Sequence, residues 1–118
     1  MTVNEKIVQA LLPFGLPIMA DFFGGGAKEY FTFNYADERG AIFADDTPMA
    51  GIAYMQIHYF CPLKKDQVEL KKRIKKALFE AGFTYPSITE LPEADSKDPD
   101  GGVQHLIFEC AIDYETEL

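Results

Sequence analysis

The chain has 118 residues, of which 47% are hydrophobic and 25% charged, a composition typical of a globular domain and not of a disordered chain. Its 11 basic and 19 acidic residues give a formal net charge of -8, which argues against a protein that coats nucleic acid or an anionic membrane with its whole surface. The length predicts a single domain over residues 1–118.

The N-terminal segment predicts a short amphipathic helix that ends before Pro13. Thr2 and Glu5 have the spacing of a capping box, in which each side chain accepts a hydrogen bond from the other residue's backbone N–H. The apolar residues that share one stripe of this helix are Val3, Ile7, Ala10 and Leu11. The segment has no basic region leading into an apolar core, and the chain has no run of about 18 apolar residues, so neither a secretory signal nor a membrane span is expected.

Three consecutive glycines, Gly24, Gly25 and Gly26, follow the apolar stretch Ile18–Phe23. Glycine has too much conformational freedom for such a run to hold a helix or strand, so a mobile turn is expected over Gly24–Ala27. The run lacks the downstream Lys-Ser/Thr of a phosphate-binding loop.

The middle of the chain predicts strands. Tyr30–Tyr35 alternates with a period of two, Asp37–Gly40 is rich in turn residues, and Ala41–Ala44 is a plausible antiparallel partner, so these segments predict a hairpin. Gly51–Cys61 is the longest strand signal, and Pro62 closes it. The residues expected on one face of these strands are Phe31, Phe33, Tyr35, Ala53, Met55, Ile57, Tyr59 and Cys61.

A second helix is predicted after an N-capping segment, Asp66–Glu69, and it stops at Gly82. Its apolar stripe consists of Leu70, Ile74, Ala77, Leu78 and Ala81. Beyond it we expect a short edge strand over Phe83–Ile88, an exposed acidic loop over Glu90–Gly102, and a strand over Val103–Tyr114 that pairs inside the sheet. The C-terminal Glu115–Leu118 is expected to fray.

This order of elements predicts an α+β fold in which a mostly antiparallel sheet is covered by two helices, a single-layer α/β sandwich. Charge along the chain is uneven, because seven of the 11 basic residues lie between positions 64 and 76 while residues 90–118 hold nine acids and Lys97 as their one base. The basic helix face is either a solvated surface or a contact surface. As a contact surface, it would suit head-to-tail association of identical subunits through the acidic loop.

Metal binding and catalysis have weak signals in this sequence. His58 and Cys61 are three residues apart and His105 and Cys110 are five apart, so within a strand each pair points to opposite faces. We therefore expect no metal site, no cofactor and no Cys–His nucleophile, and two reduced, buried thiols. Asp95–Gly101 resembles a calcium loop in composition only, since no Glu follows at the required position. No nucleic-acid recognition motif accompanies the basic helix, so sequence-specific binding is not expected.

Several segments together form a pattern that extends over nearly the whole chain. They are Asn4–Leu11 followed by Pro13 and Pro17, the strand Tyr30–Tyr35, the turn Phe43–Pro48, the strand end His58–Pro62, the helix Lys71–Phe83, and the strand His105–Cys110. In this order they resemble small tail proteins of siphophages and prophages of Gram-positive bacteria. Within that set the chain resembles most the tail terminator, or tail completion, group of neck proteins.

The resemblance implies an α/β sandwich that assembles into a hexameric ring on the end of the tail tube, stops tube polymerisation and presents a surface to the head connector. The partners it implies are copies of the same chain, the tail tube protein and the head completion protein. It places the protein in the virion tail or neck, and in the host cytoplasm during assembly, without catalytic activity or membrane association. The expected subunit or tube contacts are Lys71, Lys72, Arg73, Lys75 and Lys76 of the basic helix, Gly24, Gly25 and Gly26, and Asp95, Asp98 and Asp100 of the acidic loop.

Three alternatives remain open. A head-tail connector or another minor tail protein would have a similar size and composition. A small regulatory or ligand-binding module on an α+β sheet would have an apolar pocket lined by Phe31, Phe33 and Tyr59. An enzyme is the weakest of the three, because the sequence offers no recognisable set of acid, base and nucleophile.

Overall fold

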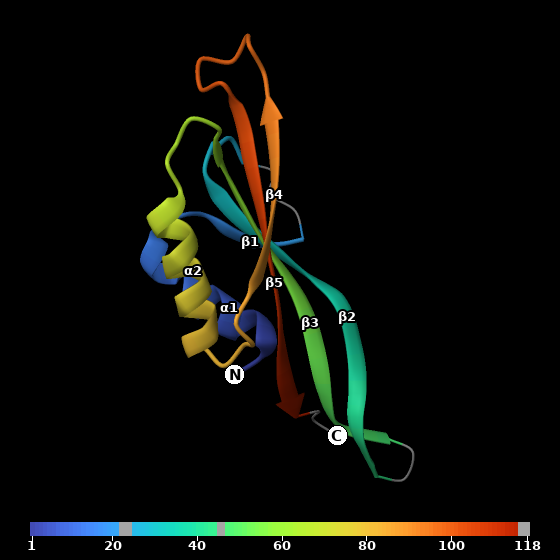
Figure 1. The fold of residues 1–118 in the computed structure, drawn as a ribbon. Coiled ribbons are helices and arrows are strands. Elements are labelled where there is room, and N and C mark those ends of the chain that lie inside the picture. Colours follow the sequence, from blue (N-terminus) through green and yellow to red (C-terminus); the bar gives the residue numbers. More distant parts are fainter. Residues whose placement is uncertain (22–24, 45–46, 116–118) are drawn as a thin grey trace.

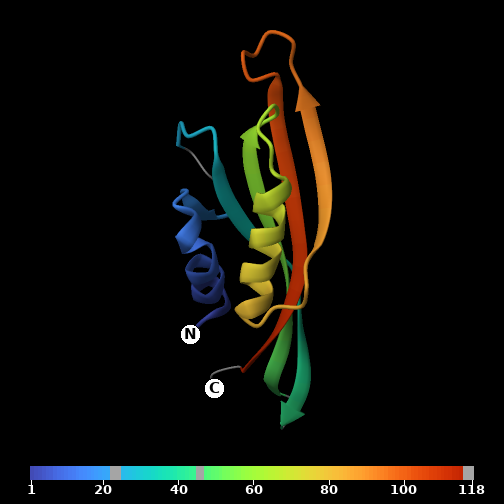
Figure 2. The ribbon, with the colours of Figure 1, turned by 60° about the vertical axis from the view of Figure 1, so that its left-hand side comes forward.

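The chain forms a five-stranded sheet with two helices on one of its faces, as seen in a computed structural model that describes residues 1–21, 25–44 and 47–115 (Figures 1 and 2). The strand order is β1-β2-β3-β5-β4, in which β1 is parallel to β2 and every other neighbouring pair is antiparallel. The elements in chain order are α1 (Val3–Leu11), the short 3-10 helix η1 (Leu12–Phe14), β1 (Ile18–Ala20), β2 (Tyr30–Ala44), β3 (Thr47–Pro62), α2 (Val68–Glu80), β4 (Ser87–Ala94) and β5 (Gly102–Glu115). This arrangement confirms the predicted α+β fold with a mostly antiparallel sheet.

Helix α1 begins where its sequence predicts. The Thr2 hydroxyl accepts a hydrogen bond from the Glu5 N–H at 3.1 Å, and the Glu5 carboxylate accepts one from the Thr2 N–H at 3.3 Å, which completes the capping box. Three apolar residues of the predicted stripe, Val3, Ile7 and Leu11, are buried against the sheet. The capping box therefore fixes the start of the helix, and the stripe fixes which side faces the core.

Helix α2 also follows the prediction, with one difference at its start. The helix begins at Val68, and the Asp66 carboxylate accepts a hydrogen bond from the Val68 N–H at 3.0 Å, while the N-cap residue Gln67 makes no side-chain capping bond. At the other end Gly82 has a φ of 105°, a left-handed conformation that a residue with a Cβ rarely adopts. The buried residues of α2 are Ile74 and Leu78. Neither this helix nor any other in the described ranges is long and apolar enough to cross a membrane.

The predicted hairpin in the first half of the chain is wrong. Residues 37–40 are not a turn but continue β2, and Ala41–Ala44 belongs to the same strand as Tyr30–Tyr35. The partner of β2 is β3, in a register that runs from Tyr30 opposite Phe60 to Ala44 opposite Thr47. Residues 37–40 pair in register with β3, from Asp37 opposite Tyr54 to Gly40 opposite Gly51, and register shifts lie on either side of them, between Tyr35 and Asp37 and around Ile42. The connection at residues 45–46 lies outside the described residues.

The two sheet edges differ from expectation in extent. Strand β4 is an edge strand, as predicted, but it spans Ser87–Ala94 because its N–H and C=O groups pair with β5, so the first part of the expected acidic loop is strand. Pro92 is tolerated there because an edge strand needs hydrogen bonds on one side only. At the opposite edge, β1 lies beside Phe31–Phe33 of β2, and its three residues are too few for a sequence signal. Strand β5 lies between β3 and β4, as predicted.

The hydrophobic core lies between the helices and one face of the sheet. From α1 and α2 it takes Ile7, Leu11, Ile74 and Leu78, all fully buried. From the strands it takes the residues predicted for one face: Phe31, Phe33, Ala53, Met55, Ile57, Tyr59, Cys61, Leu106, Phe108, Cys110 and Ile112. Tyr35, expected on the same face, is 43% exposed.

The molecule is long and narrow, with extents of 59 × 25 × 22 Å. The β2–β3 hairpin accounts for much of this length, because it runs on past the two helices (Figure 1). Strand β5 follows β3 only as far as Ala50, so beyond that point the sheet consists of β2 and β3 alone. The part with two strands alone is short, because past Ala50 the register pairs Phe43 with Pro48 and Ala44 with Thr47, and the sheet that projects beyond the helices is otherwise three-stranded.

Candidate functional site

The sheet has one face without a helix among the described residues, which we call the open face. Side chains alternate along each strand, so the residues between the core positions point to this side. The open face comprises Met19 of β1; Tyr30, Thr32, Asn34 and Asp37 of β2; Ile52, Tyr54, Gln56, His58 and Phe60 of β3; Ser87, Thr89, Leu91 and Glu93 of β4; and Val103, His105, Ile107, Glu109, Ala111 and Asp113 of β5. Both histidines of the chain are on this face, whereas both cysteines are in the core.

A row of stacked rings crosses the open face from β2 through β3 to β5. The rings of Tyr30 and Phe60 are stacked with centroids 4.8 Å apart, and Phe60 and His105 are stacked at 4.2 Å. His58 lies beside this row, its ring 5.0 Å from that of His105. Because these ring faces cover one another, they are not free to stack on a nucleobase or sugar, which is the use that exposed aromatic strands would have in a nucleic-acid platform.

A chain of hydrogen bonds runs through four polar residues beside the rings. Asn34 Nδ2 donates to Gln56 Oε1 at 3.1 Å, and the Asn34 oxygen lies 2.7 Å from His58 Nε2, so this histidine nitrogen carries the proton and donates. His58 Nδ1 is then an acceptor, and His105 Nε2 donates to it at 2.7 Å. With both imidazoles neutral, every bond in the chain points the same way, from β5 to β3, to β2 and back to β3.

Burial disfavours charge on both histidines. It lowers the pKa of His58, opposed by the nearby Glu109 carboxylate, and it lowers the pKa of His105, where His58 acts in the same direction. Burial therefore favours the neutral state, in which His58 Nδ1 accepts a hydrogen bond from His105 Nε2. Sequence reasoning missed this cluster because the face of His58 was predictable, but the register that brings β5 alongside it was not.

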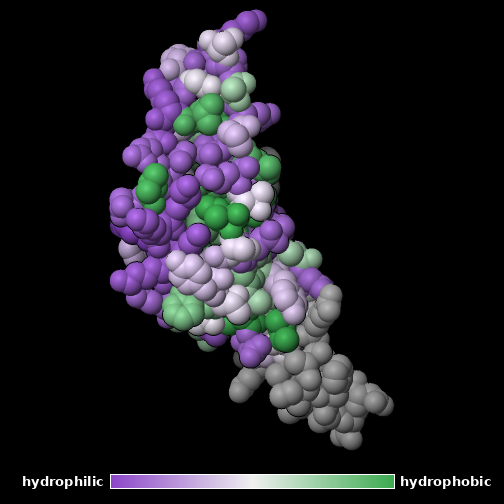
Figure 3. Space-filling view, in the orientation of Figure 1, coloured by the Kyte–Doolittle hydropathy of each residue, from purple (hydrophilic) through white to green (hydrophobic). Residues whose placement is uncertain are grey.

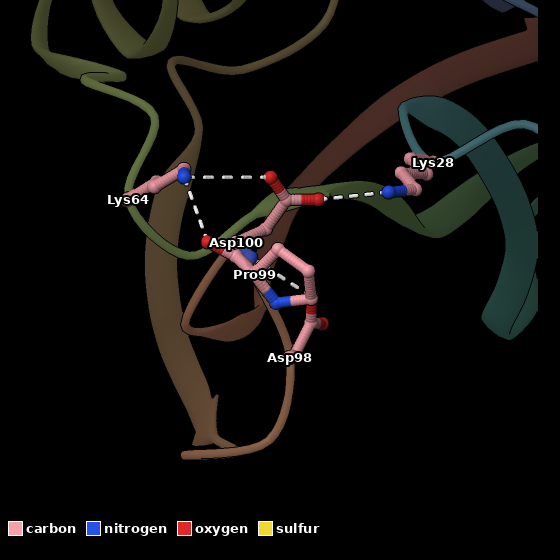
Figure 4. A network of polar contacts seen from close by, with 5 residues as sticks. All are labelled: Lys28, Lys64, Asp98, Pro99 and Asp100. Carbon is pink, nitrogen blue, oxygen red and sulfur yellow. Dashed lines mark hydrogen bonds and ion pairs between the residues drawn. The ribbon is translucent and has the colours of Figure 1, made fainter.

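A small pocket of about 220 Å³ lies at the end of the sheet where the 95–101 loop meets the start of β2. Its lining consists of Ala27, Lys28, Tyr30, Phe60, Cys61, Pro62, Asp98, Asp100, Gly102 and Val103. The Lys28 ammonium forms an ion pair with the Asp100 carboxylate at 2.9 Å, and Lys64 Nζ donates to the Pro99 carbonyl at 2.7 Å (Figure 4). This side of the pocket is thus held closed by the chain's own charges.

The acidic residues predicted as contact sites serve the structure of their own loop. Asp95 accepts a hydrogen bond from the Lys97 N–H at 3.0 Å, and Asp98 accepts one from the Asp100 N–H at 2.9 Å. The pKa of the Asp100 carboxyl is lowered, chiefly by its hydrogen bond from Lys28. These bonds are typical of turns built by aspartate side chains. They leave untested whether Asp95, Asp98 and Asp100 also contact a partner.

The Glu29 carboxylate makes two polar contacts near the same end of the sheet. It accepts a hydrogen bond from the Tyr59 hydroxyl at 2.7 Å and an ion pair from Lys65 at 2.6 Å. Burial raises the pKa of Tyr59, so this hydroxyl stays protonated and remains a donor. The contact explains how the loop before β2 is fixed to the end of β3.

The basic residues predicted as contact sites are on the surface of α2, where they meet three kinds of neighbour. Lys72 and Lys76 form weak ion pairs along the helix with Glu69 at 3.6 Å and Glu80 at 3.8 Å. Lys71 reaches across to Glu90 of β4 at 3.1 Å. The remaining two lie over aromatic rings, Arg73 over Phe14 at 5.0 Å and Lys75 over Tyr85 at 5.9 Å.

Large apolar side chains lie among these cations. Val68 is 52% exposed, Phe79 56% and Tyr85 61%, and the rings of Phe79 and Tyr85 meet edge to face at 5.9 Å. Hydrophobic spots interrupt the otherwise hydrophilic surface on the helical side of the molecule (Figure 3). The outward side of α2 is therefore a mixed surface, on which exposed apolar side chains lie among the cations.

The other predicted sites have these outcomes. Gly24 lies outside the described residues, while Gly25 and Gly26 are exposed and belong to no helix or strand. Cys61 and Cys110 are free and buried, as predicted, and burial raises the pKa of Cys110 to about 12. Within the described ranges no three His, Cys, Asp or Glu side chains form a group suited to a metal ion.

The ligand pocket imagined for a binding module is wrong in its residues. Phe31, Phe33 and Tyr59 pack into the hydrophobic core, and none of them lines the pocket beside Lys28 and Asp100. That pocket takes Tyr30 and Phe60 from the open face of β2 and β3.

Comparison with known proteins adds no assignment. The sequence matches no model of a known protein family, and no curated protein is significantly similar to it.

Proposed function

We propose that the protein is a structural subunit of a phage tail, a tail terminator that assembles with copies of itself into a ring on the tail tube and joins the tube to the head. The phage tail is what the sequence resemblance implies. An assembly role is supported by one structural observation, the β2–β3 hairpin that extends beyond the helices.

The end of β2 and β3 that runs past the helices has no helix over it in the described part of the chain (Figure 1). Strand β5 pairs with β3 as far as Ala50, and past that residue β2 and β3 pair with each other through Phe43 opposite Pro48 and Ala44 opposite Thr47. Strands gain stability when a helix or a further strand packs against them. A neighbouring subunit or the tail tube would supply such a surface at this end of the sheet.

The test is an in-frame deletion of the coding gene from the phage or prophage that carries it, followed by electron microscopy of the particles. A terminator stops tube growth, so its loss is expected to give tails of uncontrolled length without heads, and expression of the intact gene in trans restores them. Tails of normal length that fail to join heads would instead identify a head-tail connector. Complete, infectious virions in the deletion strain would overturn a structural role in the tail.

A further inference from the structure

The open face and the outward side of α2 are complementary surfaces on opposite sides of one molecule. The helices cover one face of the sheet, so the solvent side of α2 and the open face point away from each other (Figures 1 and 2). We propose that the open face of one subunit docks on the outward side of α2 in a second copy, head to tail. This inference rests on the proposed self-assembly and names the two surfaces that meet.

The charges of the two surfaces are opposite. Helix α2 carries five basic residues and two acidic ones, and neither Arg73 nor Lys75 has an ion pair among the described residues. The register of β2 places one base, Arg39 opposite Ile52, at an open-face position, and the open-face carboxylates Glu93, Glu109 and Asp113 have no ion pair in the part of the chain that the structure describes. In contrast, Glu29, Glu90 and Asp100 form ion pairs within the chain. The open face thus has carboxylates without an ion pair, and α2 has two cations, Arg73 and Lys75, that lie over aromatic rings and have no ion pair among the described residues.

The apolar groups match in the same way. On α2, the exposed Val68 and Phe79 lie at the two ends of a stripe that has lysines between them, and Tyr85 lies beside Phe79. On the open face, Tyr54 is 38% exposed, Leu91 47% and Val103 39%. Interfaces gain most of their affinity from apolar and aromatic groups at the centre, while opposite charges set the orientation. Both surfaces have this composition.

The placement on opposite sides decides the symmetry. In a two-fold dimer, a surface contacts the same surface of the partner, or two different surfaces of one molecule both contact the same partner. The second arrangement requires both surfaces to lie on the side that faces this partner. Surfaces that point in opposite directions join subunits in series, and such a series closes into a ring when the rotation between neighbours allows it. The second copy is therefore the occupant that both surfaces fit at once.

The experiment is a charge exchange between two variants of the full chain. The first variant carries Glu109→Lys and Asp113→Lys on the open face, and the second carries Lys72→Glu and Lys76→Glu on α2. Association is measured by sedimentation velocity at about 50 and about 500 mM salt, since screening weakens complementary surface charges. The ion pairs lost in the second variant are exposed and weak, and circular dichroism checks that both variants fold.

Each variant alone is expected to associate at least about tenfold more weakly than the original chain, because every contact then opposes like charges. An equimolar mixture is expected to recover association, since each reversed surface meets its reversed counterpart. The matched control is Lys97→Glu, which reverses an exposed charge outside both surfaces and should leave association unchanged. Recovery in the mixture cannot come from a misfolded variant.

Three outcomes would overturn the docking. An original chain that stays monomeric up to about 1 mM has no such contact. Variants that associate as well as the original chain show that another surface is used, and a mixture that stays dissociated shows that the two surfaces do not meet each other. The gene deletion tests the proposed function independently, so a failed exchange with overlong tails would remove this interface and keep the terminator.

Discussion

The two faces of the same sheet use their side chains in opposite ways. On the core face, Phe31, Ile57 and Phe108 are fully buried by apolar contacts with helices and neighbouring strands. On the open face, the same strands hold their side chains in place by ring stacking and by the hydrogen bonds of Asn34 and His58. Apolar packing against the helices thus stabilises the core face. The open face is ordered by ring stacking and hydrogen bonds, and its charged groups are available for a partner.

Removing a large ring from each face is the strongest test of this difference. Phe108→Ala in the core is expected to lower the free energy of unfolding by about 3–5 kcal/mol, since it removes buried surface and leaves a cavity. The matched change on the open face is Ile107→Ala, one residue away, with an expected loss of about 1 kcal/mol because its side chain is only partly buried. Urea denaturation of both variants measures the losses. Equal losses would contradict the assignment of the core to one face.

A glycine on the core side of β3 offers a test by addition of a single carbon. A Cβ at Gly51 would lie 2.6 Å from the ring of Tyr114, its partner on β5, so Gly51→Ala is expected to destabilise the protein by about 1–3 kcal/mol. The same change in a Tyr114→Ala background should cost much less, because the obstructing ring is gone. Thermal denaturation of the four chains in this cycle measures the coupling, and additive effects would show that the contact is absent.

The hydrogen-bond chain of the open face predicts a dependence of stability on pH. Burial lowers the pKa of His58 and of His105 in the folded state, so below a pH of about 6.5 the unfolded chain binds protons that the folded chain does not. Stability is therefore complete above that pH and falls on acidification. His58→Gln is expected to cost about 1 kcal/mol at neutral pH and to reduce the loss between about pH 7.5 and 5.5. Urea midpoints across this range measure both effects, and an unchanged slope would mean that other groups cause it.

The smallest expected effect concerns the thiols of the core face. Cys61 and Cys110 are buried, and burial raises the pKa of both, so neither offers a thiolate at neutral pH. Labelling with a thiol reagent is expected to be slow in the folded protein and complete in denaturant, with two groups counted per chain. Cys110→Ser labelled under the same conditions assigns the remaining rate to Cys61. Rapid labelling of the folded chain would place a thiol on the surface.

The sequence predicted what depends on local pattern. Period-two alternation placed Phe31 and Phe33 in the core, and the capping box and Gly82 placed one end of each helix. The composition of residues 37–40 was misleading because turn-forming residue types pair in register with β3, between two register shifts. The acids Glu90 and Glu93 concealed the second part of the edge strand β4, which was expected to end at Ile88. The contact of His58 with His105 could not be predicted from the sequence, because it depends on the register of two strands far apart in the chain.

The pairing of β3 with β5 has a kinetic consequence. The β2–β3 pair and the β4–β5 pair each join neighbouring strands, whereas Ile57 of β3 meets Phe108 of β5 only after α2 and β4 have been passed. Contacts between residues distant in sequence require loop closure before they repay its entropy, so they slow folding. Pairing of β3 with β5 joins the two hairpins into one sheet. The open face is therefore complete only after this slow pairing has formed.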